Sequence, residues 1–207
     1  MRLREEIKIQ AKAAFKENYG VCLGVFVVAM LISFFSAYTG PLAFLIAIPL
    51  SLGLICHFTM VFYGGSPDFS TMFQQGFGVN YGRKLGGYLW MQLWIFLWSL
   101  LFVIPGVIKA YAYQAAPYIL ANYPDVEAME ALNLSKRITH GHKAELFVFD
   151  LSFIGWHLLS AFTFGLLEIF YVGPYYATAQ AGYLGELIET AVRDGVIKPS
   201  ELNVAYE

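Results

Sequence analysis

Residues 85 to 121 form an almost continuously apolar stretch that is too long for one membrane-crossing helix. As a single α-helix it would extend about 55 Å, whereas the hydrocarbon core of a bilayer is about 30 Å thick. The stretch must therefore break. Ile104-Pro105-Gly106 is the expected point, because proline removes a backbone donor and glycine tolerates left-handed dihedrals. We expect two membrane segments, 85–104 and 107–121, joined by a tight reversal.

Four other apolar runs each approach the roughly 20 residues that cross a bilayer. These runs are 19–38, 41–63, 146–164 and 169–187. Turn signals at Thr39-Gly40-Pro41 and near Gly165 separate the members of each pair. The sequence therefore predicts an all-α fold, a polytopic transmembrane helical bundle of about six spans arranged as three hairpins. Segment 107–121 is short, so we expect it to tilt little, to thin the bilayer locally or to be partly re-entrant.

Composition favours the bilayer over water as the solvent of this chain. Hydrophobic residues make up 58% and charged residues 14% of the sequence, against about 25% charged residues in soluble proteins. The net charge is −2, and the basic residues lie in short clusters, so nucleic-acid binding is excluded. Cys22 and Cys56 lie inside apolar runs, where thiols behave as small hydrophobes.

The segments outside the predicted spans are amphipathic or polar. Residues 1–18 place four basic residues four apart beside an apolar stripe, which predicts a helix lying in the membrane interface. The basic residues are Arg4, Lys8, Lys12 and Lys16, and the stripe is Leu3, Ile7, Ala11 and Phe15. We expect one membrane domain over 19–190, with cytoplasmic segments at 64–84 and 122–145 and a cytoplasmic tail at 191–207. Segment 64–84 is expected to hold a short surface helix, and segment 122–145 an amphipathic helix ending near Thr139.

Basic residues set the predicted orientation. A reversal at Gly106 returns Lys136, Arg137 and Lys143 to the side of the N-terminal lysines and of Arg83-Lys84, as the positive-inside rule requires. A mere kink would place them outside. Both termini are therefore predicted to be cytoplasmic, and the first span is predicted to be uncleaved.

Five motifs carry a resemblance to a known family. They are Trp98-Ser-Leu-Leu-Phe-Val-Ile-Pro-Gly-Val-Ile-Lys-Ala-Tyr, Ala116-Pro-Tyr-Ile-Leu-Ala, Ala131-Leu-Asn-Leu-Ser-Lys, Gly141-His-Lys and Asp150-Leu-Ser-Phe-Ile-Gly-Trp. In this order they resemble the bacterial membrane family labelled domain of unknown function 975. That family is similar to the membrane region attached to some glycerophosphodiester phosphodiesterases. The resemblance implies a multi-pass protein of the bacterial plasma membrane and carries over no catalytic residues.

Ionisable side chains within apolar spans usually face a protein interior or a wet cavity. The positions of this kind are His57, Lys109, Asp150, His157 and Glu168. Lys109 and Glu168 follow the two outer turns, so they are expected to snorkel or to pair across the two hairpins. For His157, a satisfied bundle histidine competes with a proton relay. For Asp150, anchoring of a neighbouring helix end competes with ion coupling.

The basic segment before the fifth predicted span offers contacts for anionic head groups. Its members are Lys136, Arg137, His140, His142 and Lys143. Head-group contact competes here with simple topology determination. His140 and His142 could supply two metal ligands with Glu145 or Asp150, but two histidines around one glycine rarely suffice. The sequence therefore predicts no catalytic, metal or cofactor site.

A weak internal echo relates the two C-terminal hairpins, because Trp98, Gly106 and Pro117 recur as Trp156, Gly165 and Pro174. Such repeats are common in transporters. The last span also carries a face of small residues that predicts close helix packing. This face consists of Gly173, Ala177, Ala179, Ala181, Gly182 and Gly185.

Three functions remain open from these observations. The leading hypothesis is a non-enzymatic inner-membrane protein that binds a lipid or hydrophobic peptide, or an accessory subunit of an envelope complex, because no catalytic or cofactor signature is present. The alternative is a small transporter or exporter with a wet cavity joining His157, Asp150 or Lys109. A membrane-embedded lipid enzyme would need His140, His142, Glu145 and Asp150 to converge. The expected partners are membrane lipids, with a membrane-protein partner or a second copy as further options.

Overall fold

The computed structural model describes residues 4–36, 38, 40, 43–78, 80–101 and 103–202 of the chain, and every regular element in them is helical. The first half contains α1 (Arg4–Glu17), α2 (Tyr19–Ser36), α3 (Ala43–Phe62), α4 (Phe69–Phe77), α5 (Tyr81–Leu101) and α6 (Val103–Ala112). The second half contains α7 (Ala116–Asn122), α8 (Ala128–Ile138), α9 (Lys143–Leu151), α10 (Ile154–Phe162), a π-helical turn (Glu168–Val172), α11 (Gly173–Arg193) and a 3₁₀ turn (Pro199–Leu202). The all-α prediction is confirmed.

The predicted six spans are corrected to three candidates. Among the described residues, α2, α3 and the pair α9–α10 (Lys143–Phe162) are long and apolar enough to cross a membrane. Segment 107–121 is divided between α6 and α7, which have 10 and 7 residues. Pro117 explains the division. Inside one continuous helix it would lack a backbone donor and clash with the carbonyl group of the preceding turn, whereas in the first turn of α7 its missing N–H breaks no helical bond. Helices α5 and α11 are each 21 residues long, but their tyrosine, glycine and glutamine residues lower their hydropathy.

The predicted reversal between 85–104 and 107–121 is present, slightly earlier than expected. α5 ends at Leu101 and α6 begins at Val103, so Pro105 and Gly106 lie in the first turns of α6. Pro105 is tolerated there because the first N–H groups of a helix have no intrahelical partner. A Cβ added to Gly106 would lie 2.3 Å from Ser99 Oγ, so the two limbs contact each other closely.

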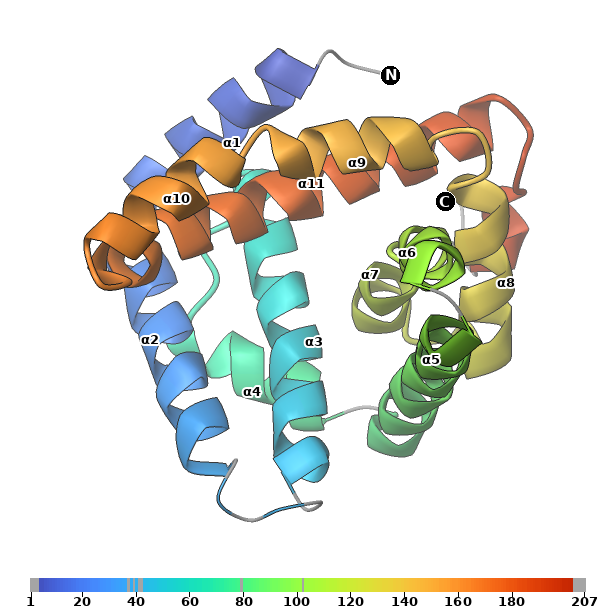
Figure 1. The fold of residues 1–207 in the computed structure, drawn as a ribbon, viewed down its shortest axis with the longest axis horizontal. Coiled ribbons are helices and arrows are strands. Elements are labelled where there is room, and N and C mark those ends of the chain that lie inside the picture. The colour runs from blue at the N-terminus through green and yellow to red at the C-terminus, as the bar shows by residue number, and fades with distance from the viewer. Residues whose placement is uncertain are drawn as a thin grey trace.

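The helices pack in three groups. Figure 1 shows α2 and α3 side by side, α5 to α8 opposite them, and α9, α10 and α11 across one end of the molecule. α3 contacts α2, α4, α5, α7 and α11. Its crossing with α4 depends on glycine, since a Cβ on Gly53 would lie 2.1 Å from the Met72 carbonyl oxygen. The predicted helices of segments 64–84 and 122–145 are present as α4 and α8, although α8 begins only at Ala128.

The apolar stripe of α1 faces protein. Ile7, Ala11 and Phe15 are fully buried, and α1 contacts α11 and α3. Lys8 donates a hydrogen bond to Ser152 Oγ and places its ammonium 4.4 Å from the centre of the Phe153 ring. Burial lowers the pKa of Lys8. The apolar stripe of α1 therefore packs against protein, and the interfacial position of α1 stays a prediction.

The last hairpin turns where the sequence predicts it. Phe164 and Gly165 have φ values of 53° and 81°, the left-handed conformation of a helix end. The π-helical turn that follows leads into Pro174, which enters α11 within its first turn. The small-residue face packs inside the chain, because Gly173 lies against Phe26. Gly182 likewise packs against the Phe62 ring, because a Cβ added there would lie only 2.2 Å from a ring carbon.

Candidate functional site

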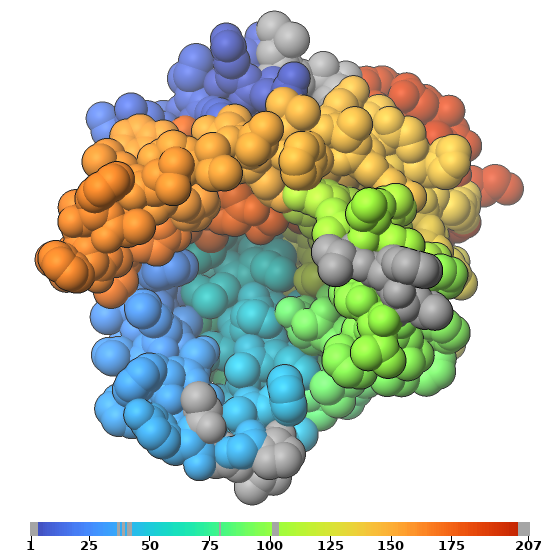
Figure 2. Space-filling model, in the orientation of Figure 1, coloured from blue at the N-terminus to red at the C-terminus, as the bar shows by residue number. Residues whose placement is uncertain are grey.

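A central cavity of about 330 Å³ lies between the helices. It falls within the hollow that Figure 2 shows between the α9–α10 band, α2–α3 and α5–α6. Residues from α2, α3, α5, α6, α7 and α11 line it, including Phe26, Leu54, Phe58, Tyr88, Met91 and Ala177. Apolar and aromatic walls of this kind suit a hydrophobic ligand, and the volume lies at the lower end of the about 300–1,000 Å³ typical of ligand pockets.

Two glutamines give this cavity a polar wall. Gln114 and Gln180 line it from the end of α6 and from α11. The Gln114 Oε1 atom is buried and has no hydrogen-bond partner within the part of the chain that the structure describes. An unpaired buried acceptor costs about 1–3 kcal/mol.

The same glutamines connect the cavity to Asp150 on α9. Asp150 Oδ2 accepts hydrogen bonds from Tyr111 Oη at 3.0 Å and Gln114 Nε2 at 3.5 Å. Asp150 Oδ1 accepts one from Tyr176 Oη at 2.9 Å. Gln180 Nε2 in turn donates to Tyr176 Oη at 3.1 Å. These bonds join α6, α9 and α11, so the hypothesis that Asp150 anchors neighbouring helices is consistent with its contacts.

A second pocket of about 300 Å³ is lined by Asp150 and His157. His157 Nδ1 lies 3.0 Å from Glu168 Oε2, across the Gly165 turn. The structure therefore brings together three of the predicted polar positions, Asp150, His157 and Glu168, along one side of the last hairpin.

Lys109 lies elsewhere. Its ammonium is 5.0 Å from the centre of the Trp98 ring, within the α5–α6 hairpin. Glu168 contacts His157 and Lys109 contacts the Trp98 ring, so the pairing of Lys109 with Glu168 is not among the described contacts, and snorkelling of these residues stays a prediction. The physical reason is that each hairpin closes on itself, and the charged residue after each turn contacts the preceding limb.

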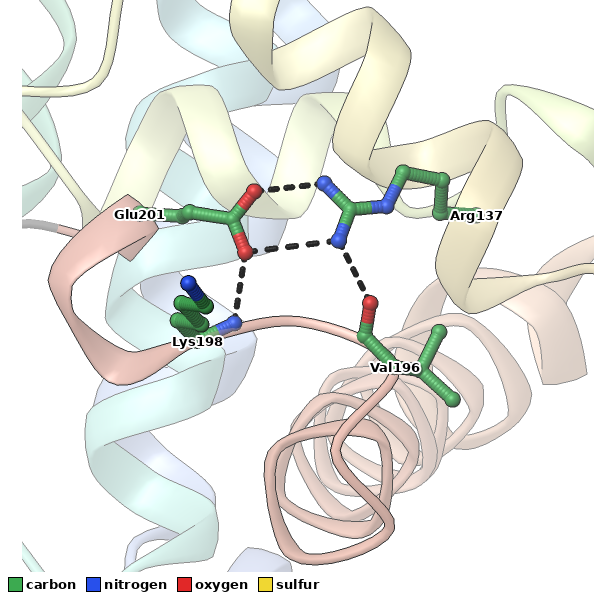
Figure 3. Close-up of polar contacts among 4 residues, drawn as sticks. All are labelled: Arg137, Val196, Lys198 and Glu201. Carbon is green, nitrogen blue, oxygen red and sulfur yellow. Dashed lines mark hydrogen bonds and ion pairs between the residues drawn. The ribbon is translucent and has the colours of Figure 1, made fainter.

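Arg137 is occupied by the C-terminal segment (Figure 3). Its guanidinium forms a 2.5 Å ion pair with Glu201 and donates to the carbonyl oxygen of Val196. Glu201 also accepts the backbone N–H of Lys198 at 2.6 Å. The Arg137 guanidinium and the Lys198 N–H lower the pKa of the Glu201 carboxyl, and the Glu201 carboxylate raises the pKa of Arg137. The positive charge of Arg137 is therefore balanced by a carboxylate of the same chain.

The basic residues Lys136, His140 and His142 lie with Arg137 around two pockets beside Val196, whereas Lys143 lines neither pocket. His142 Nδ1 lies 3.2 Å from Glu145 Oε2, and Lys136 lies 5.3 Å from the centre of the Tyr113 ring. His140 and His142 line a pocket of about 110 Å³ beside α11. Lys143 begins α9. No group of three or more metal-ligating His, Cys, Asp or Glu side chains occurs among residues with a described position.

Comparison with known proteins places most of this architecture in one family. A family model described as a protein of unknown function (DUF975) matches residues 42–190, from the start of α3 to nearly the end of α11. The chain belongs to the DUF975 family. No curated protein and no solved structure matches it.

Within this DUF975 chain, sequence reasoning missed several structural residues. Gln114 and Gln180 were not singled out, although each is an uncharged polar residue inside an apolar stretch. Arg83 was assigned to topology alone, yet it donates to the carbonyl oxygens of Leu120 and Val126 and so holds the end of α7. Lys84 is buried and donates to the Gln75 carbonyl oxygen, and burial lowers its pKa.

Proposed function

We propose that this DUF975 protein is a non-enzymatic protein of the bacterial inner membrane that binds a lipid or hydrophobic peptide in its central cavity. The observation that carries the proposal is the apolar cavity of about 330 Å³ with Gln114 and Gln180 on its wall. An acyl chain or apolar side chains would contact Phe26, Leu54 and Phe58. A rotation of the Gln114 amide would bring Oε1, which is buried and has no partner within the described structure, to the cavity wall, where a donor on the polar part of the ligand would bond to it.

Exposed apolar side chains support a membrane location. Phe35 is 66%, Phe162 84% and Phe164 98% exposed, which water would disfavour. In α2 and in α9–α10, only 22% of the 18-residue apolar stretch is buried within the protein. Their outer faces would contact lipid chains, and a membrane-protein partner or a second copy could cover part of the same surface.

We place both termini in the cytoplasm. The α2–α3 hairpin returns the chain to its starting side, and so does the α5–α6 reversal. Helix α11 runs antiparallel to α9–α10, with Phe153 beside Tyr175 and Phe149 stacked on Tyr183 at 4.6 Å. Protein therefore shields much of α11, which lets it return across the bilayer without high hydropathy of its own.

A small transporter is the second candidate. The supporting observation is that Asp150 and His157 line one pocket of about 300 Å³, while Gln114 connects Asp150 to the central cavity. Carboxylate and imidazole groups beside a cavity are frequent in proton-coupled transport. Labelling of cysteines substituted at 150 and 157 with water-soluble reagents distinguishes the two functions, because transport requires water at both positions.

The test of ligand binding is native mass spectrometry of the protein purified in mild detergent. We expect a lipid or peptide in the cavity of the wild type, and we expect Ala177→Trp, whose indole would fill the cavity, to retain one ligand molecule fewer than the wild type. Ala161→Trp is the matched control, because Ala161 lies on the exposed face of α10 and outside the cavity lining. Equal ligand retention in both variants would refute binding in the cavity.

A further inference from the structure

A groove of about 260 Å³ runs between α5, α6 and α8, on a different side of the protein from the Asp150 pocket. Trp90, Trp94 and Trp98 line it from α5, where a spacing of four residues places them on one face of the helix. Met129 and Leu132 line it from α8. Among the described residues, the two linings have only Tyr113 in common, so the groove and the central cavity are neighbouring sites with otherwise different walls.

Two lysines bring positive charge into this aromatic groove. Lys109 and Lys136 belong to its lining, from α6 and α8 respectively. Each ammonium is placed over an aromatic ring, Lys109 over Trp98 at 5.0 Å and Lys136 over Tyr113 at 5.3 Å. Neither lysine is within ion-pair distance of a carboxylate in the described ranges. This contrasts with Arg137, whose charge is matched by Glu201.

We propose that this groove binds an anionic phospholipid, with the phosphate between Lys109 and Lys136 and an acyl chain along the tryptophans. Charge complementarity selects the anion, because two ammonium groups without a carboxylate attract a phosphate as point charges. The lining selects a lipid over a free phosphate, because three indoles, Met129 and Leu132 offer apolar contact that only an acyl chain uses. Tryptophan is the residue most suited to such a boundary, with an apolar body and a polar N–H.

The test compares phosphatidylglycerol with phosphatidylcholine of identical acyl chains, titrated onto the full-length protein in detergent and counted by native mass spectrometry. We expect the wild type to prefer phosphatidylglycerol. Lys109→Gln and Lys136→Gln should each weaken phosphatidylglycerol binding about fivefold, and the double variant more than tenfold, with phosphatidylcholine binding unchanged. Lys109→Arg and Lys136→Arg should keep most of the affinity, which shows that charge is responsible and that the variants fold.

Lys12→Gln is the matched control, because Lys12 is exposed on α1 and outside the groove, and it should bind as the wild type does. Ala177→Trp, which blocks the central cavity, should also leave phosphatidylglycerol affinity unchanged. Equal affinity in the double variant and the wild type overturns the proposal. So does displacement of the lipid by soluble glycerol phosphate at millimolar concentration, which would mean that the groove recognises a free phosphate.

Discussion

The Tyr176 hydroxyl donates a 2.9 Å hydrogen bond to Asp150 and thereby joins α11 to α9. Tyr111 Oη adds a bond from α6 to the same carboxylate. Asp150 thus connects three helices that lie far apart in the sequence. Asp150 also lines the second pocket together with His157, and its bond from Gln114 connects it to the central cavity.

Asp150→Ala should destabilise the protein. The substitution removes the acceptor of Tyr111, Tyr176 and Gln114, and each donor left unsatisfied costs about 1–3 kcal/mol. We expect a loss of at least about 2 kcal/mol, measured as a lower midpoint of thermal unfolding in detergent. Tyr176→Phe, which removes one donor, should cost about 1 kcal/mol. Asp68→Ala is the control, because Asp68 is exposed; an equal loss there would show that Asp150 has no special structural role.

Gly53→Ala should disrupt the crossing of α3 and α4. The added Cβ would lie 2.1 Å from the Met72 carbonyl oxygen, a backbone atom that cannot rotate away. We expect a destabilisation of about 1–3 kcal/mol from overpacking. Gly155→Ala is the matched control on α10, where a Cβ meets nothing within 4 Å. It should be neutral or stabilising by up to about 1 kcal/mol, because alanine favours helix over glycine. Equal unfolding midpoints for the two variants would contradict the packing argument.

The C-terminal segment should loosen at low pH. Arg137 and the Lys198 N–H lower the pKa of Glu201, so the stabilisation is complete above the ordinary carboxyl value of 4.5 and is lost as the pH falls through the pKa of the folded protein. The pair is partly exposed, so its contribution is no more than about 1 kcal/mol. Hydrogen exchange of residues 196–202, corrected for the intrinsic rate, should rise at pH 3 relative to pH 7.

Arg137→Gln should remove this pH dependence and expose the same amides at pH 7. Arg193→Gln is the control, because it removes a nearby arginine that lies outside the Arg137–Glu201 cluster. The ion pair of Arg193 is with Asp194, at 3.8 Å. Unchanged exchange in Arg137→Gln would mean that packing of Ile197 and Leu202 holds the segment without the ion pair.

Reporter fusions should place the N-terminus and His140 in the cytoplasm, and a fusion at Gly106 shows whether the α5–α6 hairpin crosses the whole bilayer, because Ser135 and Thr139 both donate to the Ala112 carbonyl oxygen, six residues after Gly106. The reason is that the α5–α6 reversal returns Lys136, Arg137 and Lys143 to the side of the N-terminal lysines. A fusion at Thr39, which lies outside the described residues, should be external. A cytoplasmic Gly106 would mean that the α5–α6 hairpin is re-entrant, and an external His140 would overturn the orientation.

Local chemistry by itself determined the helical class and the places where helices end. The apolar runs, the proline after Ile104 and the glycine at 165 act within one or two turns of the backbone, so their effects follow from the sequence. The positions of α4, the α5–α6 reversal and the last hairpin were predictable for this reason.

Only the tertiary structure decided which apolar faces meet protein and which stay exposed. The stripe of α1 is apolar in the way that a lipid-facing surface is apolar, and composition cannot separate the two environments. The small-residue face of α11 predicts close helix packing, but not whether the partner helix belongs to the same chain. The partners of Asp150, Lys109 and Arg137 come from distant helices or from the neighbouring limb of a hairpin. Pairing of that kind depends on how the helices pack, which no local pattern of residues encodes.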